Sequence, residues 1–132
     1  LLISAANKGT VLSGVSAGAI CWFRYGNSDS RKFTSNSSQL IRVSGLRVVD
    51  LLFCPHYDVE TSRQKDLKRM MKNTPGVAVA CENCTALKIV GNEYEILRSK
   101  PSAKAYKCYW TNGKYIKTEL NSGLVKELIS KA

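Results

Sequence analysis

The residue of this chain that is best placed for chemistry is a serine set between two glycines. Ser16 is the centre of a G-x-S-x-G pattern at residues 14–18, which separates an apolar run at residues 10–13 from another at 20–23. This pattern is typical of a sharp turn from a strand into a helix, with the serine exposed at the corner. We expect a glycine at both positions because a Cβ would clash where the chain passes close to itself. The chemistry that suits such a serine is acyl transfer.

The residue after the serine could stabilise the charge that acyl transfer creates. An oxyanion that forms beside Ser16 would meet the backbone N–H of Ala17 at the start of the expected helix, so Ala17 is a candidate oxyanion-hole residue. The alternative is a turn rich in glycine, serine and alanine that only packs tightly or holds a phosphate. The five residues of the pattern leave both interpretations open.

A nucleophilic serine needs a base, and the chain has one histidine. His56 follows a strand-like run at residues 47–53, and the carboxyl ends of parallel strands are where α/β folds place their chemistry. Because Ser16 also follows an expected strand, the two side chains could meet. The alternative is that His56 is an ordinary turn residue after Pro55.

The third group of such a site is an acid that orients the histidine. Glu82 follows a short apolar strand at residues 76–81 and is therefore placed at a carboxyl end as well. Three other carboxylates compete with it by their spacing, namely Asp50, Asp58 and Glu60. Spacing alone does not choose among the four.

Four segments resemble, in order and spacing, the dipeptidase E and cyanophycinase family of serine peptidases, which shares its architecture with class I glutamine amidotransferases. They are residues 14–19, 29–31, 54–58 and 82–87. The resemblance implies that Ser16 is the nucleophile, His56 the base and Glu82 the third member. It also implies that Arg63 receives the acidic side chain of an N-terminal aspartate. The alternative for Arg63 is an ordinary surface position on the helix that it opens.

Members of this family carry a further half-domain before the serine, which includes the second oxyanion donor. We therefore expect residues 1–132 to form a single domain that is the carboxyl-terminal portion of a larger peptidase domain. A missing oxyanion donor typically lowers turnover by about a hundredfold to a thousandfold, so the chain by itself could be inactive.

The expected fold class is α/β with a parallel-sheet core of the flavodoxin-like type, truncated at the N-terminus, and antiparallel strands at the C-terminal end. The expected helices are 1–7, 17–25, 62–72 and 123–131, with a polar loop at 26–39. The expected strands are 10–14, 47–53, 77–81, 86–90, 94–98, 105–110 and 114–118. The last two are expected to form a hairpin through Asn112-Gly113.

Composition excludes several classes of protein. With 132 residues, of which 44% are hydrophobic, the chain can bury one core. It has no apolar run of about 18 residues and no signal peptide, so no membrane association is expected. Its five cysteines are an odd number and predict reduced thiols in the cytoplasm. Cys81 and Cys84 form a C-x-x-C pair, but without a second pair or a nearby histidine it predicts neither a metal site nor a cofactor.

The net charge of +10 raises the question of nucleic-acid binding. The basic residues between 63 and 72 recur at helical spacing, as on a solvated helix face, and no nucleic-acid motif is present. We therefore expect no specific nucleic-acid binding. The excess positive charge favours acidic substrates instead.

These observations together predict a serine exopeptidase that hydrolyses short peptides with an N-terminal aspartate through a Ser-His-Glu triad. One alternative is an impaired or inactive truncated peptidase that acts as a binding or assembly module. Another is a basic protein that adheres to nucleic acids. The expected partners are a short peptide substrate and either a complementing N-terminal half or a second copy of the chain.

Overall fold

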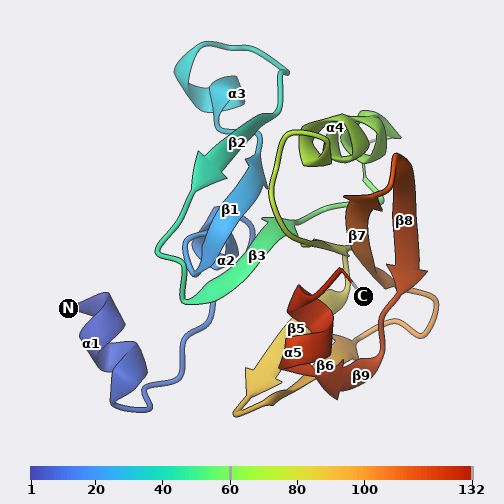
Figure 1. The fold of residues 1–132 in the computed structure, drawn as a ribbon. Helices are drawn as coiled ribbons and strands as arrows, with labels where there is room; N and C mark the ends of the chain where they lie inside the picture. The colour runs from blue at the N-terminus through green and yellow to red at the C-terminus, as the bar shows by residue number, and fades with distance from the viewer. Residues whose placement is uncertain (60, 132) are drawn as a thin grey trace.

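The fold is built on a six-stranded sheet with the order β2-β1-β3-β4-β7-β8, shown in Figure 1. The computed structural model describes residues 1–59 and 61–131. The strands of this sheet are β1 (Phe23–Ser28), β2 (Ile41–Ser44), β3 (Val49–Cys54), β4 (Ala78–Cys81), β7 (Ala105–Thr111) and β8 (Lys114–Glu119). Strand β3 is parallel to both β1 and β4, whereas the remaining pairs are antiparallel.

A second, antiparallel sheet and five helices complete the described structure. The second sheet has the order β5-β6-β9, formed by β5 (Thr85–Val90), β6 (Glu93–Arg98) and β9 (Ser122–Leu124). The helices are α1 (Leu2–Asn7), α2 (Ala17–Ile20), α3 (Arg31–Thr34), α4 (Thr61–Met71) and α5 (Val125–Ile129). Helix α1 buries no residue and stands apart from the large sheet in Figure 1.

Strands β3 and β4 are buried on both faces, as expected of central parallel strands. Successive side chains of a strand point to opposite faces, so Leu51 and Phe53 belong to one core while Leu52 and Cys54 belong to the other. The first core also contains residues of β6 and α5, for example Ile96 and Leu128. The second sheet and α5 therefore pack against one face of the large sheet.

Helix α4 covers the other face. Leu67 and Met71, four residues apart on one side of the helix, are 0% and 2% exposed and pack in the core that contains Ala78 and Ala80 of β4. The basic residues predicted to form a solvated helix face include Arg69, whose side chain is 74% exposed. An exception among them is Arg63, which is buried.

The C-terminal hairpin confirms a prediction from local sequence. Thr111 pairs with Lys114, and the two residues between them, Asn112 and Gly113, have φ values of 48° and 73°. Two positive φ angles are what a type I′ turn requires, and Asn-Gly adopts them readily.

The predictions for the first thirty residues are partly wrong. Residues 10–14 form no strand and pair with neither sheet, and Val11 is 89% exposed. The predicted helix 17–25 ends at Ile20, and β1 begins at Phe23. A Cβ on Gly26 would lie 2.2 Å from Cγ2 of Ile20, so the short helix α2 packs directly on this strand.

The predicted loop at 26–39 contains the end of β1 and the helix α3, and the strand β2 was not expected. Strand β1 is stabilised by pairing on both sides and by the rings of Phe23 and Phe53, which stack with centroids 4.7 Å apart. These tertiary contacts override the local helical pattern.

The α/β fold class is confirmed, with a correction to the sheet. Its parallel core consists of three strands within a mixed sheet, rather than of a mainly parallel one. The flavodoxin-like arrangement and the larger domain stay predictions. No helix in the described ranges is long and apolar enough to span a membrane.

We expect Leu67→Ala to lower the free energy of unfolding by about 2–5 kcal/mol, because a fully buried side chain leaves a cavity between α4 and the sheet. Leu97→Ala is the matched control, since Leu97 is 43% exposed. Urea unfolding followed by circular dichroism measures both. Equal losses in the two variants would contradict this packing of α4.

Candidate active site

The candidate residues after strands lie at one edge of the sheet because their strands are parallel. Strand β3 pairs with β1 through Phe53 and Gly26, and with β4 through Cys54 and Ala80. The carboxyl ends of all three strands therefore meet at the same edge. Asp29, His56 and Glu82 follow these ends, so the structure brings the last two to one edge, as their positions after strands suggested.

His56 lies in a tight turn and has a positive φ angle, which only a few per cent of non-glycine residues adopt. Its φ is 53°, in the left-handed region, and the next residue, Tyr57, is 2% exposed and anchored in the core. The Tyr57 N–H donates to the carbonyl of Cys81 at 3.0 Å, which ties the histidine loop to the end of β4. This support fixes the backbone from which the imidazole projects.

The imidazole of His56 is hydrogen-bonded to Asn83. Its Nδ1 lies 2.7 Å from the Oδ1 of Asn83. The Asn83 N–H in turn donates to the carboxylate of Asp58 at 2.8 Å. Sequence reasoning did not single out Asn83, and the available signal was its position directly after Glu82 in the same loop.

The Glu82 carboxylate is hydrogen-bonded to the backbone of Lys104. Its Oε2 accepts a hydrogen bond from the Lys104 N–H at 2.8 Å, and its own N–H donates to the Lys104 carbonyl at 3.0 Å. Within residues 1–59 and 61–131 no hydrogen bond joins Glu82 to His56. The role of Glu82 as the third triad member stays a prediction.

The competing carboxylates are placed differently. Asp50 pairs with Arg47 and Arg24, and the hydrogen bond from Arg47, followed by the charges of both arginines, holds the pKa of Asp50 below its usual value despite partial burial. The Asp58 carboxylate accepts a hydrogen bond from the backbone N–H of Asn83 rather than from the imidazole. Glu60 lies outside the described residues.

Ser16 stands at the start of α2 in a strained conformation. Its φ of 53° and ψ of −117° lie outside the regions that non-glycine residues normally occupy. Its carbonyl accepts hydrogen bonds from the N–H groups of Ala19 and Ile20, both at 3.0 Å. As the first residue of α2, Ala17 has an N–H without an intrahelical acceptor.

The described residues include no hydrogen bond between Ser16 and His56. Ser16 also follows a segment without strand structure, instead of the expected strand end. The contact between the nucleophile and the base therefore stays a prediction.

The two glycines beside Ser16 have different roles. A Cβ on Gly14 would lie 2.1 Å from the carbonyl oxygen of Gly18, so the close approach predicted there is confirmed. A Cβ on Gly18 would meet nothing within 4 Å. The predicted clash at Gly18 is wrong, because the close contact involves its backbone oxygen and not its Cα substituent.

Arg63 is buried between α4 and the end of β1. Its side chain is 2% exposed, so the alternative of an ordinary surface position is wrong. Nη1 donates to the backbone oxygen and to Oδ1 of Asn27 at 3.2 and 3.1 Å, and Nη2 lies 3.8 Å from the carboxylate of Asp29. Its buried Nε has no partner. A substrate-binding role for Arg63 stays a prediction, since these contacts occupy the end of the guanidinium.

A lysine and two aromatic rings lie beside the histidine loop. The ammonium of Lys117 is 4.2 Å from the ring centroid of Tyr106 and 5.0 Å from that of Tyr57. Burial, followed by the negative charge of neighbouring groups, raises the pKa of Tyr57. Lys117 therefore places a positive charge over the ring of Tyr57, the residue that follows His56.

The C-x-x-C pair has one buried and one exposed member. Burial raises the pKa of Cys81 to about 11, whereas Cys84 is exposed. Over the described part of the chain, no three His, Cys, Asp or Glu side chains are grouped closely enough to hold a metal ion.

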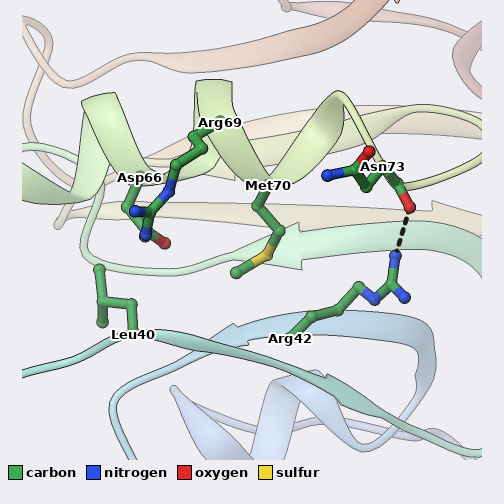
Figure 2. A pocket seen from close by; sticks show the side chains of 6 residues that line it. All are labelled: Leu40, Arg42, Asp66, Arg69, Met70 and Asn73. Atoms are coloured by element: carbon green, nitrogen blue, oxygen red, sulfur yellow. Dashed lines mark hydrogen bonds and ion pairs between the residues drawn. The ribbon is translucent and has the colours of Figure 1, made fainter.

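A shallow hollow of about 330 Å³ lies elsewhere, between α4 and the segment that leads into β2. Figure 2 shows its lining and the hydrogen bond from Arg42 to the carbonyl of Asn73, 2.9 Å long. The lining residues are Leu40, Arg42, Asp66, Arg69, Met70 and Asn73, none of which was predicted to act in catalysis.

We expect Gly14→Ala to distort the turn that carries Ser16 and to lower the melting temperature, because the new Cβ meets a backbone oxygen that cannot move aside. Gly18→Ala is the matched control, and it should be neutral or stabilising by up to about 1 kcal/mol because alanine favours a helix. Differential scanning fluorimetry compares the two. A variant pair with equal melting temperatures would argue against the close approach of Gly14 and Gly18.

We expect Arg63→Met to lower the free energy of unfolding by about 2 kcal/mol or more, since it leaves the backbone oxygen and the Oδ1 of the buried Asn27 without their charged donor. Arg69→Met on the same helix should cost less than about 1 kcal/mol, because the Arg69 side chain is 74% exposed and Asp66 keeps its hydrogen bond from Asn27. Denaturant unfolding measures both variants. A cost no larger at position 63 than at position 69 would contradict a structural role for Arg63.

Comparison with known proteins supports the resemblance drawn from the four motifs. The sequence pattern of Peptidase family S51 matches residues 1–97. The chain is also 32% identical over 109 residues to the uncharacterized peptidase YgaJ of Bacillus subtilis (strain 168), an alignment that covers 81% of this chain. The chain spans 45% of the length of that relative. On this evidence the chain belongs to peptidase family S51.

Proposed function

We propose that the chain contributes the nucleophile and the base of a serine peptidase. The observation that carries this proposal is the backbone of Ser16, whose φ of 53° and ψ of −117° present the hydroxyl on a strained turn at the start of a helix. Backbone strain of this kind costs about 1–3 kcal/mol and persists where the surrounding structure enforces it, typically at functional sites. Because the chain belongs to a peptidase family, we relate this backbone strain to a catalytic role of Ser16.

In the proposed reaction, the Ser16 oxygen attacks the carbonyl carbon of a peptide bond while His56 accepts the hydroxyl proton through Nε2. The Ala17 N–H donates to the oxyanion of the tetrahedral intermediate. His56 then gives the proton to the leaving amine, and an acyl-enzyme remains. Water, deprotonated by His56, hydrolyses the ester and regenerates Ser16. The contact of His56 Nδ1 with Asn83 supports this scheme because it leaves Nε2 available to the serine.

Two residues are candidates for the third member of the triad, the group that contacts the histidine. The resemblance proposes Glu82, which lies at the same edge of the sheet but binds the Lys104 N–H. The geometry of the described residues favours Asn83 as the group that contacts the imidazole.

For the substrate we propose a short peptide with an N-terminal aspartate. The net charge of +10 and the position of Lys117 beside Tyr57 support an acidic substrate. Direct binding of the aspartate by Arg63 would require Asp29 to give up its ion pair with the arginine. The carboxylate of the substrate would then replace that of Asp29 at the guanidinium of Arg63.

A second candidate function is an impaired peptidase that serves as a binding or assembly module. Two observations favour it. Ser16 and His56 share no hydrogen bond in the described residues, and Val11 and Val15, on the segment before the serine, are 89% and 83% exposed. In this case the segment would be covered by a complementing N-terminal half or by a second copy of the chain.

We expect a fluorophosphonate probe to modify Ser16 in a reaction that depends on His56, because a serine hydroxyl at its ordinary pKa is a poor nucleophile without a base. His56→Ala should reduce the labelling rate at least about a hundredfold, the lower range of the contribution of a general base. Tryptic peptide mass spectrometry identifies the labelled residue. Ser13→Ala is the matched control and should label at the parental rate.

Labelling that survives His56→Ala unchanged would contradict the proposed base. Failure of the parent chain to label, while the melting curve shows a folded protein, would favour the binding or assembly module. Cleavage of an Asp-X dipeptide, compared with the matching Asn-X dipeptide, tests the substrate. A preference for the neutral peptide would contradict the proposed specificity.

A further inference from the structure

The hollow between α4 and the segment that leads into β2 takes no part in the proposed reaction. Its volume of about 330 Å³ lies within the range of small-molecule sites, about 300–1,000 Å³. In Figure 2 the Met70 side chain descends from α4 toward the segment that carries Leu40 and Arg42. Leu40 is 7% exposed, and Met70 packs against the core beneath α4. The apolar wall that these two side chains form is therefore held in place.

The guanidinium of Arg42, which lies beside this wall, is held by three contacts. Its Nη1 donates to the carbonyl of Asn73 at 2.9 Å and to the hydroxyl of Thr74 at 2.8 Å. Its Cζ lies 4.8 Å from the ring centroid of Tyr25. In the described residues, Nε and Nη2 of Arg42 have no hydrogen-bond acceptor. These two atoms form one edge of the guanidinium, which a carboxylate can bind through both of its oxygens.

The charges around the hollow favour an anion. Its lining contains two arginines, Arg42 and Arg69, and one carboxylate, that of Asp66. Both oxygens of Asp66 have donors, because Oδ2 accepts from the Asn27 side chain at 2.9 Å and Oδ1 accepts from Arg69 at 2.6 Å. Arg69 therefore balances the charge of Asp66. Among the described residues, no carboxylate lies within ion-pair distance of Arg42, so its positive charge is left uncompensated.

The buried polar cluster of α4 fixes the shape of the hollow. Arg42 lies opposite Asn27 in the pairing of β2 with β1. Asn27 is fully buried and joins Asp66 of the hollow to Arg63 through hydrogen bonds of 2.9 and 3.1 Å. The same contacts that place α4 on the sheet therefore set the distance between its lining and that of β2. A ligand would meet a site that is already formed, which lowers the entropic cost of binding.

We propose that this hollow binds the C-terminal residue of a short peptide, with the α-carboxylate on Arg42 and an apolar side chain against Leu40 and Met70. The free edge of Arg42 offers a carboxylate two parallel hydrogen bonds. A C-terminal residue carries its carboxylate and its side chain on the same carbon, so it can meet the guanidinium and the apolar wall together. The site goes beyond the proposed function, because none of its lining residues takes part in the proposed reaction.

The two methionines of the chain allow binding to be measured at the hollow itself. Met70 lines the hollow, whereas Met71 is 2% exposed in the core and is an internal control. The probe is N-acetyl-L-leucine, followed by ¹H–¹³C correlation spectra of the full chain labelled at the methionine methyl groups. We expect the Met70 signal, assigned with Met70→Leu, to shift with a dissociation constant of about 1–10 mM, the range for a ligand of about a dozen atoms. The Met71 signal should not move.

Variants at arginine positions test the carboxylate contact. Arg42→Gln should raise the dissociation constant about tenfold or more, the factor that a hydrogen bond to a charged group contributes. Arg42→Lys keeps the charge without the planar fork and should bind with intermediate affinity. Arg47→Gln is the matched control, since it removes an equal charge from a residue that pairs with Asp50, and should bind like the parent. Ser16→Ala should also bind like the parent. Melting temperatures show whether each variant is folded.

Two further probes separate the carboxylate contact from the apolar one. N-acetyl-L-leucinamide lacks the charge and inorganic phosphate lacks the apolar group, so each should bind about tenfold more weakly or less. Equal binding of the acid and the amide, equal binding of phosphate, or equal losses in Arg42→Gln and Arg47→Gln would overturn the proposal. So would a Met70 signal that the probe leaves unchanged. A chain that binds the probe but is not labelled by the fluorophosphonate contradicts the proposed function alone.

Discussion

The parallel pairing of β1, β3 and β4 is the constraint on which the rest of the structure depends. Because β3 is buried on both faces, its alternate side chains supply two separate cores, one covered by α4 and the other by the second sheet and α5. The same pairing sends the three carboxyl ends to one edge. Stability and the placement of the candidate site therefore have a single physical origin.

A buried polar cluster connects this edge to the helix that covers the sheet. Arg63 reaches from α4 to Asn27 and Asp29 at the end of β1, and Asn27 continues to Asp66 on the same helix through a hydrogen bond of 2.9 Å. Buried charge is costly unless it is paired, so these contacts specify where α4 lies on the sheet. An arginine that resemblance associates with substrate thus has a structural task in this chain.

The structure holds His56 in place with more contacts to neighbouring elements than it gives the segment before Ser16. Hydrogen bonds to the adjoining loop hold both the backbone and the imidazole of His56. Ser16, the proposed nucleophile, has a strained backbone and follows a segment with no strand partner. The chain spans 45% of the length of its relative from Bacillus subtilis.

Much of this protein could be predicted from its sequence, because local patterns determine local structure. Apolar runs, alternating apolar residues and a two-residue Asn-Gly turn predicted the strands β3 to β8, and helical spacing predicted α4. The helix predicted at 123–131 was wrong at its start, because residues 122–124 form β9 by pairing with β6. The motifs at Ser16, His56 and Glu82 were sufficient to indicate the family. Only the tertiary structure decided that residues 23–28 form a strand, that Arg63 is buried and that Asn83 contacts the histidine. Each of these depends on a partner distant in the chain, and a local pattern carries no information about which distant side chain will satisfy a given hydrogen bond.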